Sequence, residues 1–538
     1  MIMRKSPFYL FLHNRVTIII LIFLIFSSCA KDEDVFLQAI EDNIEESIDD
    51  EESEVDEESE GDEESEESEG DEESGDPQND DEVSSDLKAF PTAFGAGSNA
   101  DGFRGGEILH VTSLEDDYNN VREGTWRWAI TRDYPRIIVF DVSGQINLSG
   151  RIVLNNSNSN AYIAGQTSPN GIMIRGYSMY ASGLNDVIIR NVKFYGDPSK
   201  VIAPNDPSSA RRPLIQFVSP SNVVVDNCDF IFNENEGMNF WSSEGIVAGG
   251  ATMQNCIIGE GDTGVLMGGD ECNTQLGGEY SAIRNLFVHI SHRHPNFTAN
   301  VKGESINNIV YNSRSRLSRV SCNAQANFYG NYYKAGSATF FSEVNRINLV
   351  RDDDGADVYV DETYWSFMSG MVENATDTHT DIFNAAQSGT NQAKTSQPPV
   401  NNWSLSEPVS LIGNRPSIVD NIVAYDEVLR NAGARKYLNS NGSTDVITDS
   451  KQEQYINDVI NNGNTNGSGS DYGFDLGIYD PPSIDENQRS SNYDTDRDGM
   501  PNIWEIANGF NPDIDDSSAD SDGDGYTNIE EFLNLIDL

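Results

Sequence analysis

Two short segments near the C-terminus place oxygen-bearing side chains at alternate positions. They read DTDRDGMPNIWE (494–505) and DSDGDGYTNIEE (520–531). The candidate ligands are Asp494, Asp496, Asp498, Asn502 and Glu505 in the first segment, and Asp520, Asp522, Asp524, Asn528 and Glu531 in the second. Alternate oxygens can converge on one hard cation, the glycine allows a sharp turn, and the final glutamate can bind with both oxygens. We therefore predict that each loop binds Ca²⁺.

The two loops resemble EF-hand loops and thrombospondin type 3 repeats. They begin 26 residues apart, and the chain ends soon after the second, which predicts a compact calcium module over residues 491–538. A disordered acidic tail is the alternative interpretation. Because both loops lie far in sequence from the basic segment described next, we expect their calcium ions to be structural.

A second group of reactive side chains lies at residues 289–295. Three of the six histidines, His289, His292 and His294, fall here beside Arg293 and Pro295. A metal site built from the histidines is one interpretation. Alternate residues of a strand point to opposite faces, so histidines divided between the core and a surface groove are the interpretation we prefer.

Composition limits the function classes. The chain has 538 residues, 34 Lys and Arg against 88 Asp and Glu, and a net charge of −54. Such a chain is a poor nucleic-acid binder, because binding phosphates requires Lys and Arg to displace counterions. Five cysteines in 538 residues also exclude a small disulfide-framed protein. The low apolar content of 37% suits a long repeat fold with a polar surface.

The N-terminus is typical of an exported lipoprotein. An apolar run, Val16–Phe26, follows three basic residues and is shorter than a membrane span. Ser-Ser-Cys then resembles a lipobox, which predicts a signal peptide over 1–28 and lipidation of Cys29. The following KDED resembles the surface-export tag of Bacteroidetes lipoproteins. We predict an outer-membrane lipoprotein exposed at the cell surface, with a secreted protein as the alternative.

Residues 29–88 form a predicted acidic tether. The stretch 41–83 holds 26 acidic residues and no Lys or Arg. With almost no apolar side chains and strong self-repulsion, it is predicted to stay disordered.

From residue 89 the sequence repeats a short apolar strand, an asparagine and a second apolar group. The shared asparagines are Asn191, Asn227, Asn255, Asn285, Asn308 and Asn331, at steps of 36, 28, 30, 23 and 23 residues. This irregular stride predicts an all-β, parallel β-helix whose coils differ in loop length. Stacked amides would bond from coil to coil, and Cys228 and Cys256 would be small buried fillers.

Ordered motifs along residues 89–440 resemble bacterial pectate lyases of polysaccharide lyase family 1. They are GFRGG (102–106), HVTSLED (110–116), PRIIVFDVSGQI (135–146), YIAGQTSPNGIMIRGYS (162–178), HRHPNF (292–297), FYGNYYKAG (328–336) and NAGAR (431–435). The resemblance implies a right-handed parallel β-helix over 89–440. The Asn/Ser/Gly-rich stretch 441–490 would then be a polar linker.

The resemblance implies cleavage of polygalacturonate by β-elimination. A base removes the C5 proton, charge spreads into the C6 carboxylate, and the O4 bond breaks. Cations must neutralise that carboxylate and the developing negative charge. The family uses Ca²⁺ and basic side chains, and its base is an Arg in an Arg-x-Pro motif, which here is Arg293. His294 and Pro295 are then expected at the substrate.

The chain departs from the family pattern at three cationic or metal positions. The family's second Arg is replaced by neutral residues, for which Lys302 is a candidate substitute, and its Lys one coil earlier is missing. The expected calcium Asp falls at Pro213, beside Arg211 and Arg212, which we predict to neutralise substrate carboxylates instead. The remaining groove calcium candidates are Glu244 and Asp226, and coil-turn acids without a metal are the alternative for both.

These residues predict a monomeric, calcium-using pectate lyase anchored outside the cell, with a plant-type acidic polysaccharide as substrate. Two alternatives remain open. One is a β-helix that binds carbohydrate without turnover, because cationic residues are missing. The other is a lyase for esterified pectin or another polyuronide, which has no need of the calcium Asp.

Overall fold

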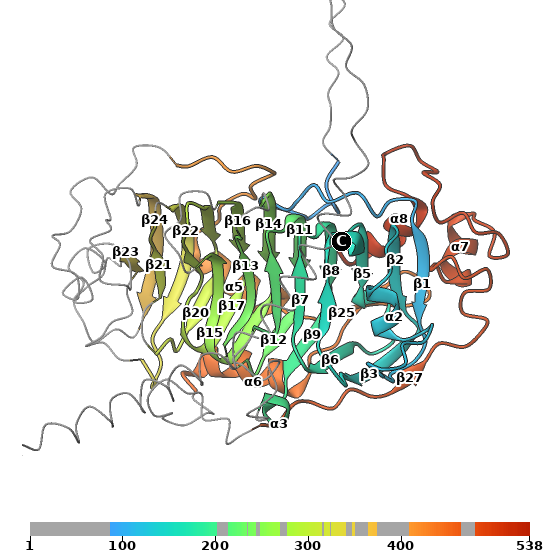
Figure 1. The fold of residues 1–538 in the computed structure, drawn as a ribbon, viewed down its shortest axis with the longest axis horizontal. Helices are drawn as coiled ribbons and strands as arrows, with labels where there is room; N and C mark the ends of the chain where they lie inside the picture. The colour runs from blue at the N-terminus through green and yellow to red at the C-terminus, as the bar shows by residue number, and fades with distance from the viewer. Residues whose placement is uncertain are drawn as a thin grey trace, which may run out of the picture. The chain divides into compact units, whose positions relative to one another are not determined.

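The computed structural model describes residues 87–537, apart from 202–212, 234, 244–247, 270–276, 315–316, 323, 340–346, 350–363, 374–407 and 464–478. Parallel strands stack coil upon coil along the molecule (Figure 1). The pairings run in three rows, and each coil gives one strand to each row. The predicted parallel β-helix is confirmed.

The first row begins the body. It contains β1 (Glu107–Val111), β2 (Arg136–Phe140), β5 (Ala161–Ala164), β8 (Asn185–Arg190), β11 (Ser221–Asp226), β14 (Gly250–Gln254), β16 (Glu279–Ile283), β19 (Lys302–Ile306) and the start of β22 (Gln325–Lys334). The second row contains β3 (Val142–Asn147), β6 (Ile172–Gly176), β9 (Val192–Gly196), β12 (Asp229–Ile231), the start of β15 (Ile257–Gly268), β17 (Leu286–His292), β20 (Ile309–Tyr311) and the end of β22.

The third row bears the candidate site. It contains β4 (Ile152–Leu154), β7 (Met179–Ser182), β10 (Ile215–Val218), β13 (Glu236–Trp241), the end of β15, β18 (Asn296–Phe297), β21 (Ser318–Val320) and β23 (Ile347–Leu349). Strand β24 (Tyr364–Glu373) pairs with β22. Short helices interrupt the early coils: α2 (Trp126–Ile130), η1 (Asn156–Asn158), η2 (Gly165–Thr167) and α3 (Pro198–Val201).

Apolar side chains fill the inside of the coils in columns. One column runs through five coils and is fully buried: Phe194, Phe230, Ile258, Phe287 and Val310. The first two rings stack at 5.4 Å between centroids. Each such side chain contributes about 1.5–3 kcal/mol by leaving water. The columns thus hold neighbouring coils in register and give the outer side chains fixed positions.

The predicted column of asparagines is wrong by one residue in half of the coils. Asn191, Asn227 and Asn255 occupy corner positions with left-handed backbone, and Arg284, Asn307 and Gly330 take those corners in later coils. The strand step there is 29 residues, from Ala251 to Tyr280, instead of the predicted 30. Asparagine suits both neighbouring positions, because it tolerates the left-handed conformation and also forms amide ladders.

The true ladder lies one residue after each corner and points inward. The Asn285 side chain donates to the Asn308 amide oxygen at 3.0 Å, and Asn308 donates to Asn331 at 3.1 Å. Cys256 and Cys228 continue the same column as buried thiols, with the Cys256 backbone donating to Asn285 at 2.9 Å. The prediction that both cysteines are buried fillers is confirmed.

The chain beyond the β-helix packs back onto it. Its elements are α5 (Asn421–Asn431), β25 (Lys436–Leu438), β26 (Thr444–Val446), α6 (Ser450–Asn461), β27 (Asn487–Gln488), α7 (Asn502–Asn508), α8 (Asn528–Asn534) and η6 (Leu535–Asp537). Helices α7 and α8 lie beside β1 and β2 at one end of the coils (Figure 1). None of the helices in the described part of the chain is long and apolar enough to span a bilayer.

The described part of 441–490 differs from the predicted linker. Helix α6 begins with a capping box at Asp449, and its Tyr455 and Val459 are fully buried against the second row. The Asp449 carboxylate also accepts from Lys193 of β9 at 2.8 Å. The polar composition concealed an amphipathic helix, because its buried face consists of only a few side chains.

Candidate active site and calcium loops

Arg293 lies at the corner between β17 and β18. Its backbone is left-handed, with φ of 72°, and its carbonyl accepts from the Val265 backbone of the preceding coil at 2.8 Å. Its guanidinium Nη1 donates to Oε1 of Glu236, two coils back on β13. The Arg293 side chain is 21% exposed and that of Glu236 only 3%. A buried carboxylate therefore holds a guanidinium that still reaches the surface.

Glu236 belongs to a row of residues that stack across the coils. It pairs with Thr263, which pairs with His292. Pro213 comes opposite Glu236 on the other side, two residues before the Ile215–Met238 pair. This row offers one carboxylate, and Arg293 already holds it. Among the described residues of this row there is thus no second carboxylate for a groove calcium, and the other predicted ligand, Glu244, lies outside the described residues.

His294 and Pro295 do not face a substrate, contrary to the sequence interpretation. His294 is 1% exposed, and its Nδ1 lies 2.8 Å from the Leu317 carbonyl. Its ring packs edge-on against Phe287 in the core, and Pro295 is buried as well. The alternation of strand residues that turns Arg293 outward turns His294 inward.

The preferred interpretation of the histidine group agrees with this geometry. His289 is buried, with Nε2 at 2.9 Å from Asp458 of α6 and Nδ1 at 2.9 Å from the Asn312 amide. Among the described residues, the clusters with metal-ligating geometry lie elsewhere, in the C-terminal loops.

Lys302 does not stand in for the missing second arginine. It begins β19 in the first row, whereas Arg293 lies between the second and third rows. Its Nζ bonds Glu279 of the neighbouring strand at 2.9 Å. The positions that follow Pro295, Asn296 and Phe297, are buried in β18.

Asp226 is structural rather than a calcium ligand. It is fully buried, and its carboxylate accepts from Arg190 at 2.9 Å and from Gln254 at 3.0 Å. Burial lowers the pKa of Arg190. The charges of Asp537 and Asp226 act in the opposite direction, and the resulting pKa lies above the usual range of arginine. The predicted calcium ligand is thus one half of a buried ion pair between β8 and β11, and Arg190 also bonds Asp537 near the C-terminus. Glu244, Arg211, Arg212 and Cys29 lie outside the described residues.

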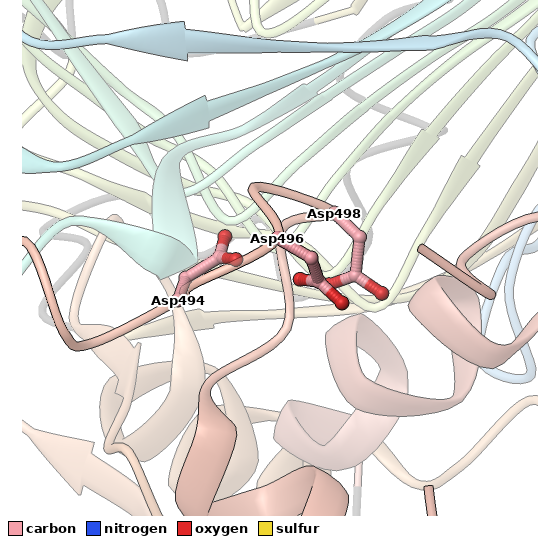
Figure 2. Close-up of side chains that lie close together, drawn as sticks. All are labelled: Asp494, Asp496 and Asp498. Carbon is pink, nitrogen blue, oxygen red and sulfur yellow. The ribbon is translucent and has the colours of Figure 1, made fainter. Parts of the chain in front are cut away.

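The first C-terminal loop brings its three aspartates together. One carboxylate oxygen from each of Asp494, Asp496 and Asp498 lies within 4.8 Å of the others (Figure 2). Glu505 is fully buried, and neither of its carboxylate oxygens makes a hydrogen bond. The Asn502 amide instead bonds the backbone and side chain of Thr495. The loop therefore gathers carboxylates, and the oxygens of Asp496 and Glu505 and one oxygen of Asp498 are left without a hydrogen bond.

Burial raises the pKa values of these acids. It brings Asp494 to about 6, Asp498 to about 8 and Glu505 to about 7, with repulsion between the carboxylates adding to the rise. The charges that act most on Glu505 are those of Asp496 and Asp494. Such a group is stable in its charged form only with a cation beside it.

The second loop has the same local structure in an exposed setting. Oxygens of Asp520, Asp522 and Asp524 also lie within 4.8 Å of one another, and all three residues are exposed. Burial raises the pKa of Glu531, with Asp524 adding to the rise. The Asn528 amide bonds the backbone and side chain of Asp516 and not the loop acids.

Comparison with known proteins finds relatives that match most of the chain. "Probable pectate lyase C" of Emericella nidulans is 27% identical over 453 residues, which cover 84% of this chain and 93% of that protein. Its Aspergillus flavus namesake is 28% identical over 460 residues, with 84% and 95% covered. The major allergen from cedar pollen superposes with a TM-score of 0.46 at 17% identity, covering 66% of this chain and 93% of its own. No family model matches the sequence.

The match with the Emericella nidulans protein covers 84% of this chain. A match of that length must span the middle of the chain, where Arg293 lies. The chain is similar to probable pectate lyases over most of its length. The predicted enzyme class is confirmed at that level of relationship.

The sequence predictions do not include Glu236, the partner of Arg293. The two residues are 57 positions apart, and strand register alone brings them together through Thr263. An alignment of the coil sequences that matches Met238 with Val265 places the Glu236 carboxylate in the same row as the segment that contains Arg293. The repeated asparagines mark only the first corner of each coil or the residue after it, so they carry no information about this outer row.

Proposed function

We propose that the protein cleaves polygalacturonate or a related polyuronide by β-elimination, with Arg293 as the catalytic base. The observation that carries the proposal is the similarity to probable pectate lyases over most of the chain, together with the partly exposed side chain of Arg293 at its corner. A guanidinium there can contact the C5 proton and the C6 carboxylate of a bound sugar. Arginine is normally protonated, so its own chemistry does not suggest a base. We assign this role to Arg293 on the family resemblance.

Glu236 acts in this proposal as a positioning residue. Its carboxylate is almost fully buried and fixes the guanidinium through a charge-assisted hydrogen bond. A long side chain held at one end loses less freedom when it meets the substrate, which favours a reactive geometry.

The test measures release of unsaturated uronides from polygalacturonate by their ultraviolet absorbance. Arg293→Lys keeps a cation beside Glu236 but changes its geometry, and should lower activity at least 100-fold. Arg284→Lys is the matched control, since Arg284 is another corner arginine with left-handed backbone, at φ of 54°. Equal activity of both variants would reject Arg293 as the base.

A lyase for esterified pectin is the second candidate. It is favoured by the single carboxylate in the row of Pro213, Glu236, Thr263 and His292, since an ester needs no calcium to neutralise it. Chelator-resistant activity on methylated pectin that exceeds activity on polygalacturonate would support it. Binding of both polymers without product on either would support a carbohydrate-binding protein.

We also propose that a lipid on Cys29 anchors the protein, as a monomer, at the outside of the outer membrane. The support is the apolar run and the Ser-Ser-Cys sequence before an acidic stretch. Cys29→Ala should abolish incorporation of labelled fatty acid and release the protein from membranes. Protease digestion of intact cells tests surface exposure.

Finally, we propose that both C-terminal loops bind calcium, supported by their converging carboxylates.

A further inference from the structure

The two C-terminal loops share one internal design. In the first, Asp494 accepts from the backbone of Arg497 at 2.7 Å and of Gly499 at 2.9 Å. In the second, Asp520 accepts from Gly523 at 2.7 Å and Gly525 at 3.1 Å. The fifth residue of each loop also accepts from the backbone two residues later, at 2.9 Å in both. The loops thus form a matched pair within one chain.

Their surroundings differ sharply. Asp498 and Glu505 of the first loop are 0% exposed, and one oxygen of Asp498 and both of Glu505 make no hydrogen bond. Both oxygens of Asp496 are buried and unbonded as well. Charged carboxylates that are buried without donors are strongly unfavourable, so in its charged form this cluster favours a bound cation. The corresponding aspartates of the second loop are solvated.

The first loop is also built into the start of the β-helix. Met500 is fully buried in a cluster with Ile137 and Val139 of β2. A Cβ on Gly499 would lie 3.2 Å from Ile108 of β1, so the loop backbone sits directly on the first coil.

His110 of β1 joins the loop to the coil by hydrogen bonds. Its Nε2 lies 3.1 Å from the Arg497 carbonyl, and its Nδ1 lies 3.0 Å from Asp141. The Arg489 backbone, just before the loop, donates to the Asp141 carbonyl at 2.7 Å. The shape of the first loop and the packing of β1 and β2 therefore depend on each other.

We propose that a calcium ion in the first loop is an integral part of the β-helix and fastens its first coils, whereas the second loop holds a readily exchangeable ion. This inference rests on the proposed calcium binding of both loops. The proposed ligands are carboxylate oxygens, which suit Ca²⁺ as a hard cation. The two buried oxygens of the Glu505 carboxylate complete the proposed site. Because binding and folding share the same contacts, removal of the ion loosens the end of the coils.

The experiment compares Asp498→Asn with Asp524→Asn, the same substitution at the fifth position of each loop. Calcium titration of chelator-stripped full-length protein is followed by calorimetry, and thermal unfolding is recorded with and without calcium. Wild type should show one tight and one at least tenfold weaker site. Asp498→Asn should lose the tight site and lower Tm by more than 5 °C, and Asp524→Asn should lose the weak site and change Tm by less than 2 °C.

Hydrogen exchange of the wild type keeps the inference testable if Asp498→Asn fails to fold. Stripping calcium should raise exchange in β1 and β2 and leave β17 and β20 protected. Equal Tm losses in the two variants, or unchanged exchange in β1 and β2, would overturn the inference. Absence of calcium binding would overturn it too, while lyase activity lost in Arg293→Lys would still support the proposed function.

Discussion

Removing the Arg293 side chain perturbs stability and chemistry together. In Arg293→Ala, Glu236 stays buried, with its side chain only 3% exposed, and loses the guanidinium that its Oε1 accepts from. A loss of activity in this variant alone would therefore not separate a missing base from a damaged fold. The double variant Arg293→Ala/Glu236→Gln removes the unpaired charge along with the arginine.

The size of the effect follows from burial. Removing one partner of a buried ion pair costs about 3–5 kcal/mol. Arg293 is 21% exposed, so solvent screens part of the interaction, and we expect about 2–4 kcal/mol. Domains are typically stable by about 5–15 kcal/mol, so Arg293→Ala should remain folded at 25 °C. The double variant should recover about 1–2 kcal/mol of the loss, as expected for residues in contact.

Urea unfolding followed by tryptophan fluorescence measures these differences, at one fixed calcium concentration for all variants. Arg293→Lys should lie within about 1 kcal/mol of wild type, because it keeps a cation beside Glu236. Lyase activity should be lost in all three variants, including the stable ones. If Arg293→Ala were as stable as wild type, or the double variant were the least stable of the set, the Arg293–Glu236 pair would not exist as described.

Three further changes test the scaffold. Asn308→Ala removes the acceptor of the Asn285 backbone and side chain, and should cost at least 1–3 kcal/mol in urea unfolding, roughly the penalty for one buried group left unsatisfied. Asp116 accepts two bonds from Arg127, at 2.7 and 2.8 Å. Burial raises the pKa of Asp116, but the bonds from Arg127 and Ser149 together with the Arg127 charge lower it by more. The stabilisation is therefore present above about pH 4, the pKa of the unfolded chain, and is lost as the pH falls through the lower pKa of the folded protein. Asp116→Asn should destabilise the protein at pH 7 and approach wild type in acid. Gly330→Ala, where φ is 56° and a Cβ would collide with a neighbouring amide, should lower Tm, whereas Ala at an exposed glycine such as Gly105 tests the backbone effect alone.

The coil architecture could be predicted because it depends on local repetition. Apolar strands of about five residues recur with an asparagine between them, and each recurrence marks one coil. The one-residue error arose at Asn285, where asparagine moved from the corner to the inward ladder while Arg284 took the corner. The residue type does not distinguish these two positions, because asparagine suits both the left-handed corner and the inward ladder.

The candidate site was predictable only in part, for a different reason. Arg293 follows from a local motif, but its partner Glu236 follows from register between coils, which varies with loop length. His294 and Asp226 were assigned to substrate and metal from their sequence neighbours. Side-chain direction decides both, and the structure turns His294 inward and pairs Asp226 with Arg190.

The Arg293–Glu236 pair also bears on which polymer the site prefers. A free guanidinium would attract the C6 carboxylate of galacturonate strongly. Here the buried carboxylate of Glu236 already offsets much of the positive charge of Arg293. A second carboxylate brought to the same guanidinium would meet repulsion from Glu236, whereas a methyl ester would meet none. With one carboxylate in the row, this pair is the feature that would favour the second candidate, a lyase for esterified pectin. If that candidate is right, relative activity on pectins of graded methylation rises with ester content, and Glu236→Gln flattens that dependence. Activity that falls with ester content supports polygalacturonate as the substrate.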